Sequence, residues 1–385
     1  MNKLAVAVPR SGRPTVLCVQ PVAEQGGSDQ ALVRMAGQLS AAGWHVHVAL
    51  PAPSPMAASY ESAGATLHVV PMRRISTSHS LGHWGAYAAG WPASVARLAA
   101  LARRCRADLV HSNSLHSWYG WAAARLAGLP HIWHAREIVT QSGAALRLER
   151  YLCRHHADLV LAASRAVADQ LTGAATRLAY ERAAPEGFVP GRAGRARALY
   201  GVDDAVPTVG YVGRIDTWKG VDVLLDAFQQ LKERHPGTAA VVAGGQVEGK
   251  EAYYRDLEAR ARATGALWLG PLTGAEAADL MADLDVLAYP STGPEPWGLA
   301  LVEALACGVP VVGTDAGGPR EMLAGLAPEA ARLVPPGDAA ALAGALGALM
   351  PATTSTAARR ARPALSLGPP PPYPAIFAGV ARLPA

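Results

Sequence analysis

Two glutamates eight positions apart, Glu295 and Glu303, flank the start of an expected helix in the segment EPWGLALVE. Gly298 allows a ligand to approach the backbone closely. Free N–H groups at Trp297, Gly298 and Leu299 would face an anion, with help from the helix dipole. Since both carboxylates can accept hydrogen bonds from diols, the segment suits a phosphate flanked by two sugars. The competing interpretation is a solvated Glu295 and a surface-helix Glu303.

A second motif, GRIDTWKG at residues 213–220, follows one expected strand and precedes a helix. Arg214 and Lys219 would therefore lie at the carboxyl end of that strand, where doubly wound sheets bind ligands. Two cations there can neutralise a diphosphate leaving group. The chain has four lysines against 31 arginines, which makes a lysine at this place notable. A solvated basic turn is the alternative.

Two weaker motifs lie in the first half of the chain. Gly27 belongs to a GGSD turn that leads into a helix, and this turn indicates either a phosphate or sugar contact or only a tight turn. It is shorter than the dinucleotide pattern G-x-G-x-x-G, which argues against a nicotinamide oxidoreductase. His134, Arg136 and Glu137 come at the end of a strand. His134 could bond a sugar hydroxyl or position an acceptor there, or it could be structural.

Residues suited to metal binding do not fall at metal-ligand spacing, so the sequence predicts no metal. Asp283 and Asp285 form a D-x-D pattern like that of metal-dependent transferases. They lie where a helix runs directly into a strand, and this position favours a role at the edge of the core. A glycine turn at Ala316–Glu321 faces the same sheet edge as the other motifs, either for close packing against a ligand or as a plain turn.

The elements that must position these residues alternate between short apolar strands and helices, which is typical of parallel sheets covered on both faces. We expect two Rossmann-like doubly wound α/β domains, 1–187 and 188–350, joined by a linker within Pro185–Arg197. A Pro-rich tail, 351–385, is either disordered or returns to the first domain. The expected strands are Thr15–Gln20, His45–Leu50, Thr66–Val70, Leu109–His111, His131–Ala135, Leu159–Ala163, Thr208–Val212, Ala239–Ala243, Leu267–Leu269, Val286–Tyr289 and Val309–Gly313. The expected helices are Asp29–Ala42, Trp91–Arg104, Trp118–Ala127, Val221–Arg234, Glu251–Ala263, Leu299–Ala306 and Ala375–Arg382.

The amino-acid composition limits which compartment and which binding partners are expected for this protein. The 385 residues are 50% hydrophobic, enough for two cores. Residues 1–190 hold 18 basic and 10 acidic residues, which fits an anionic acceptor, a membrane surface or plain solubility. No basic stripe is interleaved with aromatics, so nucleic acid is not expected. Four cysteines without a C-x-x-C pair, no signal peptide and no apolar run of spanning length predict a cytoplasmic protein, with peripheral contact at the inner membrane face left open.

Together, the R…K pair, the E-x7-E segment and the glycine turn resemble the retaining GT-B glycosyltransferases of family 4, whose two domains face a cleft. The likeness spans roughly residues 15–346. It implies transfer of a hexosyl or aminohexosyl group from a nucleotide-diphosphate sugar, UDP by family frequency, to a hydroxyl. It also implies retention of anomeric configuration by a front-face mechanism, with no metal and no other cofactor.

The resemblance also assigns roles to residues. Arg214 and Lys219 would hold the diphosphate, Glu295 the sugar hydroxyls and Glu303 the ribose. The amides of Trp297, Gly298 and Leu299 would support the β-phosphate. Gly27 would border the phosphate, and His134 would sit beside the transferred sugar. On this basis the catalytic set is His134, Arg214, Lys219 and Glu295.

The acceptor is predicted less directly. It would be a sugar, a glycan, a lipid-linked sugar or a natural product. Candidate contacts are Arg136, Glu137 and the segment Met72–Gly90, with its Arg73, Arg74, His79, His83 and Trp84. An ordinary loop is the alternative for that segment. Arg97, Arg103, Arg104 and Arg106 either touch anionic lipid or form a solvated helix face.

The chain also departs from its family and leaves two alternatives open. Pro185-Glu186-Gly187-Phe188 stands where relatives often have Asn-Gly. A GT-B-like sugar-nucleotide epimerase would need an acid/base set beyond His134. A non-catalytic nucleotide-sugar-binding relative would be expected to have lost some of the four charged residues.

Overall fold

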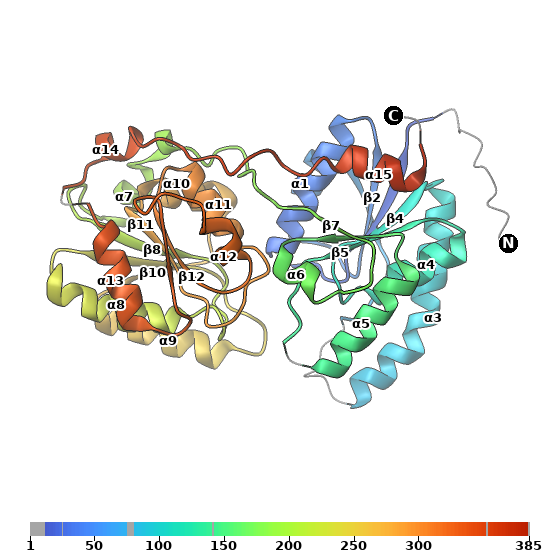
Figure 1. The fold of residues 1–385 in the computed structure, drawn as a ribbon, viewed down its shortest axis with the longest axis horizontal. Helices are drawn as coiled ribbons and strands as arrows, with labels where there is room; N and C mark the ends of the chain where they lie inside the picture. The colour runs from blue at the N-terminus through green and yellow to red at the C-terminus, as the bar shows by residue number, and fades with distance from the viewer. Residues whose placement is uncertain (1–11, 25, 75–80, 141, 352, 384–385) are drawn as a thin grey trace. The chain divides into compact units, whose positions relative to one another are not determined.

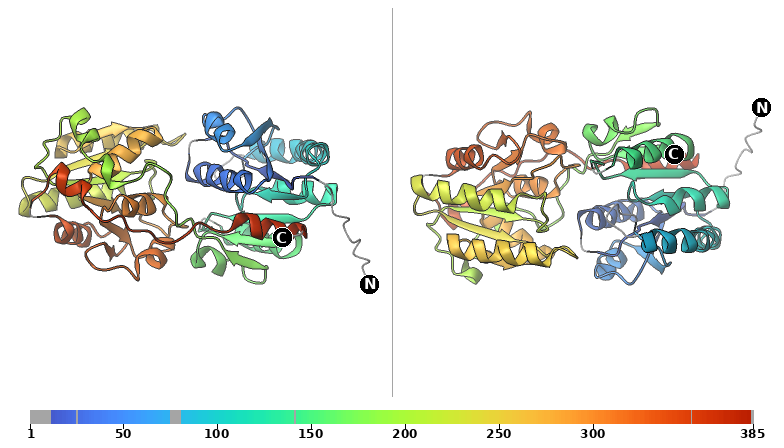
Figure 2. Two further views of the ribbon diagram at one scale, coloured as in Figure 1. Left: turned by 90° about the horizontal axis from the view of Figure 1, so that it is seen from above. Right: turned by 90° about the horizontal axis from the view of Figure 1, so that it is seen from below.

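The structure, a computed structural model, describes residues 12–24, 26–74, 81–140, 142–351 and 353–383. It divides into two compact units (Figure 1). The N-terminal unit comprises Met1–Tyr180 together with Pro371–Ala385, and the C-terminal unit comprises Glu181–Pro370. In each unit, helices lie on both faces of one sheet (Figure 2), as expected for a doubly wound α/β fold.

The N-terminal unit is built on a sheet of seven parallel strands, in the order β3-β2-β1-β4-β5-β6-β7. Buried apolar runs form its centre, since all five residues of β1 are buried. The strands are β1 Thr15–Val19, β2 His45–Leu50, β3 Ala65–Val69, β4 Leu109–Ser112, β5 His131–Ala135, β6 Leu159–Ala162 and β7 Thr176–Leu178. The helices are α1 Gly27–Ala41, α2 Ala57–Ser62, α3 Leu81–Arg104, α4 Trp118–Ala127, α5 Gly143–His156, α6 Arg165–Asp169 and α15 Tyr373–Ala381.

Helix α3 begins at Leu81, ten residues before the predicted start at Trp91. Pro92 lies inside it, and proline is common in the first turn of helices, so the sequence pattern placed the helix start too late. Part of the predicted acceptor segment Met72–Gly90 is therefore helical rather than a loop. His79 lies outside the described residues.

The C-terminal unit is built on a six-stranded parallel sheet, in the order β10-β9-β8-β11-β12-β13. Its strands are β8 Thr208–Val212, β9 Ala239–Ala243, β10 Leu267–Gly270, β11 Val286–Tyr289, β12 Val311–Thr314 and β13 Ala331–Val334. Its helices are η1 Pro190–Arg192, α7 Arg195–Tyr200, α8 Val221–Arg234, α9 Glu251–Thr264, α10 Gly274–Asp283, α11 Leu299–Ala306, α12 Gly318–Leu323, α13 Ala339–Leu349 and α14 Thr356–Arg360. The predicted linker thus contains a 3-10 turn and the start of α7.

The end of the Pro-rich tail folds as α15 and packs on α1, β4 and β5 of the N-terminal unit. Phe377 is fully buried, edge-on to Trp44 at 6.0 Å between ring centroids and 5.5 Å from the ring of His111. Tyr373 is also fully buried, 5.9 Å from the ring of His134. The last helix of the chain is therefore part of the core of the first domain.

Asp285 anchors the other part of the tail to the C-terminal unit. Its buried carboxylate accepts hydrogen bonds from Arg359 Nη2 at 2.9 Å, Arg197 Nη2 at 3.1 Å, Thr354 Oγ1 at 2.7 Å and the Thr208 amide at 2.9 Å. Burial alone would raise the pKa of Asp285, but the bonds and charge of Arg359 outweigh it and lower that pKa. A role at the core edge, as predicted for the D-x-D pattern, is confirmed.

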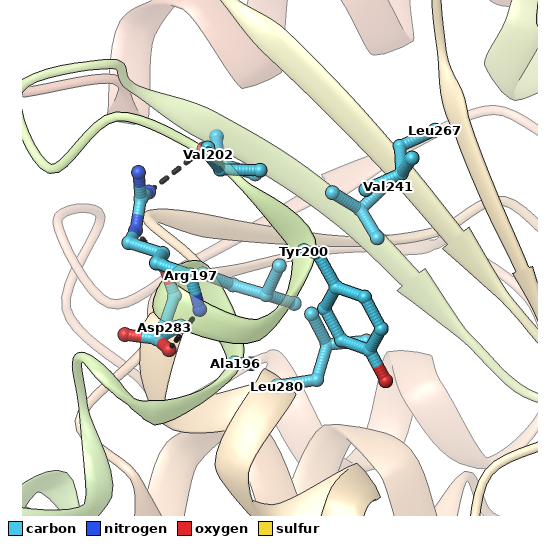
Figure 3. Close-up of a pocket in the computed structure, with 10 residues that line it drawn as sticks. Ala196, Arg197, Tyr200, Val202, Val241, Leu267, Leu280 and Asp283 are labelled. Carbon is cyan, nitrogen blue, oxygen red and sulfur yellow. Dashed lines mark hydrogen bonds between the residues drawn. The ribbon is translucent and has the colours of Figure 1, made fainter.

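Asp283 caps the start of α7 and is drawn in Figure 3. It accepts hydrogen bonds from the amides of Gly194 and Arg197, the latter at 3.0 Å, and the Arg197 side chain extends away toward Asp285. Beside this contact, Tyr200, Leu280 and neighbouring apolar residues enclose a cavity of about 10 Å³. Because that is about the space of one water molecule, this pocket cannot hold a nucleotide.

We expect Asp285→Asn to lower the free energy of unfolding by about 3–5 kcal/mol, because it leaves buried arginines without a compensating charge. Urea denaturation measures this. The matched control is Asp226→Asn, which removes an exposed ion pair with Arg260 and should cost at most about 1 kcal/mol. Equal losses for the two variants would contradict the role given to Asp285.

The stability lost in Asp285→Asn should also depend on pH. Since the pKa of Asp285 is lowered in the folded state, its stabilisation is complete above the unfolded-state value of about 4 and is lost as the pH falls through the folded-state pKa. The difference in free energy of unfolding between the wild type and Asp285→Asn should therefore be constant above about pH 4 and become smaller as the pH falls below it.

Candidate active site

Three strand-to-helix connections meet at the carboxyl edge of the C-terminal sheet. They follow β8, β11 and β12, which are neighbours in the sheet and run parallel, so their carboxyl ends lie together. The predicted motifs occupy these connections: GRIDTWKG after β8, the E-x7-E segment after β11 and the glycine turn after β12. This is the edge at which doubly wound sheets bind ligands.

Lys219 and Glu295, predicted separately as phosphate and sugar ligands, contact each other. The Lys219 ammonium donates a hydrogen bond to Glu295 Oε1 and lies 4.2 Å from the centre of the Trp218 ring. Ser291 Oγ donates to the same carboxylate oxygen at 2.7 Å. The two charged side chains are only 14% and 4% exposed. Each therefore neutralises the other in a largely dry place, where the attraction is strong.

The loop that carries Lys219 is held by a close approach of two backbones. Gly220 has φ +68, and a side chain there would place a Cβ 1.9 Å from the carbonyl oxygen of Pro290. Only glycine fits, and this brings the loop after β8 against the end of β11. Tyr211 adds a second tie, because its hydroxyl donates to the Arg214 carbonyl oxygen at 2.7 Å. Arg214 itself is exposed at the end of β8.

Sequence reasoning missed Lys250, which the structure places beside the same loop. Its ammonium pairs with Asp216 and bonds Thr217 Oγ1 at 3.1 Å. Burial alone would raise the pKa of Asp216, but its hydrogen bond to Lys250 helps to lower it. The scarcity of lysine that drew attention to Lys219 could also have indicated Lys250.

The glycine turn after β12 packs against the E-x7-E segment. The amide of Gly318 donates to the Glu295 carbonyl oxygen at 2.7 Å, and Glu295 and Gly317 form a parallel bridge. A Cβ on Gly317 would lie 2.2 Å from the Glu295 carbonyl oxygen, and one on Gly318 would lie 2.6 Å from the Trp297 Cα. These glycines therefore fix the backbone that carries Glu295.

Helix α11 begins at Leu299, as predicted, after Gly298 at φ +107. Its first amides have no partner within the helix, which is the basis of anion binding at helix starts. Trp297 is buried, and its indole N–H donates to the Glu181 carbonyl oxygen at 2.9 Å. Glu295 and Glu303 are both buried, so the interpretation of a solvated Glu295 and a surface-helix Glu303 is wrong.

His134, the candidate in the N-terminal unit, is fully buried on β5. Its Nδ1 lies 3.3 Å from His111 Nε2 and 3.2 Å from an Arg136 guanidinium nitrogen. Burial, followed by the charge of Arg136, holds the pKa of His134 well below its ordinary value, so the imidazole is neutral. In this structure it has no exposed surface, and contact with a sugar would require its surroundings to move.

A polar network links His134 and Arg136 to the Gly27 turn through Asn113 and Gln20, which sequence reasoning did not select. Arg136 Nε donates to Asn113 Oδ1 at 2.9 Å, and Asn113 Nδ2 donates to Gln20 Oε1 at 3.1 Å. Gln20 Nε2 then donates to Asp29 Oδ1 at 3.0 Å. Burial raises the pKa of Asp29 to about 6. These groups come from the carboxyl ends of β1, β4 and β5 and from the first turn of α1.

The predicted acceptor residues lie in two parts of the N-terminal unit. Glu137 follows β5, Arg74 precedes α3 and His83 lies in the first turn of α3. Glu137 accepts hydrogen bonds from Ser114 Oγ at 2.5 Å and the Leu115 amide at 2.8 Å, so it fixes the loop after β4. Arg74 pairs with Glu24 at 3.2 Å, and His83 Nε2 lies 3.0 Å from the Arg74 carbonyl oxygen.

Arg73 lines a pocket of about 340 Å³ in the N-terminal unit. Its amide N–H donates a hydrogen bond to the Tyr119 hydroxyl oxygen at 3.0 Å, and this hydroxyl donates to the Arg73 carbonyl oxygen at 3.2 Å. The other lining residues are Pro51, Pro71, Met72, Tyr87, Gly90, Ser94 and Tyr119.

Among the described helices, none has the length and apolar character needed to cross a membrane.

Comparison with known proteins places these motifs in a family. Residues 206–351 match glycosyl transferases group 1, and residues 26–183 match the glycosyl transferase 4-like domain. The chain is 32% identical over 237 residues to a D-inositol 3-phosphate glycosyltransferase of Actinosynnema mirum, covering 55% of this chain and 57% of the relative. It is 38% identical over 144 residues to a phosphatidyl-myo-inositol mannosyltransferase of Mycobacterium leprae, covering 37% of each. The chain thus spans about half the length, or less, of these curated relatives.

Solved structures show the same fold. Anabaena HepE in complex with UDP and glucose superposes with a TM-score of 0.73 at 23% identity, covering 95% of both chains. Sucrose-phosphate synthase from Thermosynechococcus elongatus gives 0.69 at 21% identity, covering 96% of this chain and 97% of that one. With the two family matches, these likenesses confirm the resemblance stated from the sequence: the chain belongs to the group 1, family 4 glycosyltransferases and has the GT-B fold.

Proposed function

We propose that this protein is a retaining, metal-independent glycosyltransferase. It would transfer a hexosyl or aminohexosyl group from a nucleotide-diphosphate sugar, UDP first, to a hydroxyl acceptor. The observation that carries the proposal is the cluster of Lys219, Glu295 and Ser291 between the ends of β8 and β11. The exposed Arg214 and the start of α11 belong to the same sheet edge.

The donor would enter this cluster by exchanging partners. Its diphosphate replaces Glu295 as the partner of Lys219, and the released carboxylate accepts hydrogen bonds from sugar hydroxyls. Arg214 and the first amides of α11 complete the diphosphate contacts, and Glu303 accepts bonds from the ribose. Lys219 is already partly desolvated in the pair, so its charge acts on the diphosphate without a large new solvation cost.

The reaction then breaks the bond between the sugar anomeric carbon and the diphosphate oxygen. The acceptor oxygen forms its bond to that carbon on the same face, and its proton passes to the departing phosphate oxygen. The products are the glycoside and the nucleoside diphosphate. Protein groups stabilise the charge that develops on the leaving diphosphate, which is the main source of the rate enhancement in this scheme.

The names of two relatives support one class of acceptor for testing. One is named for inositol 3-phosphate and another for phosphatidyl-myo-inositol. Both acceptors are polyols that carry a phosphate, so we include a phosphorylated polyol among the acceptors to be tested. The net positive charge of the first half of the chain is compatible with such an anion.

A thermal-shift panel of UDP-, GDP- and TDP-sugars tests the donor. We expect a UDP-sugar to raise the melting temperature most, since a ligand at 100 times its dissociation constant stabilises a protein by about 2.7 kcal/mol. A larger shift with a GDP-sugar would correct the base and leave the reaction class intact. No shift with any donor would contradict the proposed site.

Lys219→Met should reduce turnover by on the order of 100-fold to 1000-fold, the loss seen when one electrostatic contact to a developing charge is removed. Release of nucleoside diphosphate measures this. The control is Lys232→Met, because Lys232 also lies over an aromatic ring, 5.5 Å from the centre of Phe228 on α8. Circular dichroism checks the fold of both variants. Near-normal transfer by Lys219→Met would refute the role given to Lys219.

Glu295→Gln should weaken binding of the donor sugar more than binding of the free nucleotide. The amide keeps the shape of the side chain but loses the negative charge, so it accepts weaker hydrogen bonds from sugar hydroxyls and no longer forms an ion pair with Lys219. Titration calorimetry with UDP and with the UDP-sugar gives the two affinities. Parallel losses for both ligands would indicate that Glu295 acts only through Lys219.

A further inference from the structure

Three side chains in the N-terminal unit bring together the atoms of a metal site. His47 on β2, His68 on β3 and Cys105, the residue after α3, each offer one ligand atom, and these atoms lie within 4.8 Å of one another. His47 Nδ1 is 2.9 Å from His68 Nε2. All three residues are half-buried. They are far apart in the sequence, which is why spacing alone predicted no metal site.

The pairing of β2 with β3 puts both imidazoles on one face of the sheet. His68 is opposite Ala49, two positions beyond His47, and side chains two positions apart on a strand share a face. Ala49 packs in the same apolar cluster as Leu98 and Ala102 of α3, so α3 covers this face. Figure 1 labels α3 in the N-terminal unit, on one side of its sheet.

The end of α3 holds Cys105 in place. The Cys105 amide donates to the Leu101 carbonyl oxygen at 2.9 Å, and the Ala107 amide donates to that of Ala102 at 2.9 Å. Arg106 between them has φ +56, so the chain turns sharply after the helix. This pattern of hydrogen bonds is the common way in which a helix ends on a left-handed residue. Backbone hydrogen bonds at Cys105 and Ala107 thus fix the main chain from which the Cys105 thiol extends.

The ligand set is that of zinc. Imidazole nitrogen and thiolate sulfur bind Zn²⁺ at about 2.0–2.3 Å, so ligand atoms in a tetrahedral site lie roughly 3.3–3.8 Å apart. The three ligand atoms lie within 4.8 Å of one another, close to those separations. Imidazole and thiolate ligands suit Zn²⁺ and similar transition-metal ions, while Mg²⁺ and Ca²⁺ prefer oxygen ligands.

We propose that His47, His68 and Cys105 form a binding site for Zn²⁺ or a similar transition-metal ion, with water as the fourth ligand. Binding replaces the hydrogen bond between the two imidazoles and releases the thiol proton to solvent, with no change in oxidation state. Arg104 beside the cluster would oppose the cation, so moderate affinity is expected. The metal would tie the edge strands β2 and β3 to the end of α3.

This site is separate from the proposed transfer chemistry. Helix α3 ends just before β4 begins, so Cys105 lies toward the amino ends of the strands. The Gly27 turn follows β1 and lies at the opposite, carboxyl edge. The proposed metal is therefore structural and does not depend on the proposed function.

The test uses the full-length protein, freed of metal with a chelator and then titrated with Co²⁺. Tetrahedral Co²⁺ bound by a thiolate gives visible d–d bands and a near-ultraviolet sulfur-to-metal band. We expect both at one equivalent, with displacement by Zn²⁺. Cys105→Ser should abolish the sulfur band, and His68→Gln should weaken binding by at least about tenfold to 100-fold, the loss caused by removing even an outer partner.

The control variant is His155→Gln, which removes an exposed imidazole from the same unit and should bind Co²⁺ like the wild type. Zn²⁺ should raise the melting temperature of the wild type and of His155→Gln, but not of Cys105→Ser. The metal-free melting temperatures of all variants show whether each one folds. An absent sulfur band in the wild type, or one that persists in Cys105→Ser, would overturn the proposal.

Discussion

The ion pair between Lys219 and Glu295 is the interaction on which the candidate site depends. Neither charge would be tolerated alone at such low exposure, since an isolated buried charge is costly. Three glycines set the distance between the partners. Gly220 lets the loop after β8 approach β11, and Gly317 and Gly318 let the turn after β12 support the backbone of Glu295. The chemistry of the site thus rests on close backbone contacts that any side chain would prevent.

Buried polar groups behave in two ways in this protein. Asp285 and Arg359 of the C-terminal unit stay charged and paired. In the N-terminal unit, burial pushes His134 and Asp29 toward neutrality, with the pKa of His134 lowered and that of Asp29 raised to about 6. Helix α15 contributes to this burial, because Tyr373 and Phe377 cover the imidazoles of His134 and His111. Residues of α15 therefore contribute to the burial that lowers the pKa of His134 and His111.

Much of the fold could be predicted because it follows from local patterns. The ranges of β8, α8, β9 and α11 agree with the sequence predictions, since buried apolar runs and glycine turns mark their ends. The start of α3 could not be predicted, because proline is common in the first turn of a helix and Pro92 therefore indicated a start at Trp91. Contacts between distant residues were also out of reach. No local pattern indicates that Lys219 pairs with Glu295, that Lys250 pairs with Asp216 or that Phe377 packs on Trp44.

The pairing of Lys219 with Glu295 bears on how a donor would be selected. A ligand can pair with Lys219 only if its own anionic group replaces the Glu295 carboxylate, which also accepts a hydrogen bond from Ser291. A diphosphate with a sugar attached can offer both parts of the exchange, with phosphate oxygens for the ammonium and hydroxyls for the released carboxylate. A bare phosphate offers the first part only and leaves a buried carboxylate without its cation, which is costly. Selection for an intact sugar nucleotide would then arise from the requirement to satisfy both members of a pre-existing pair at once.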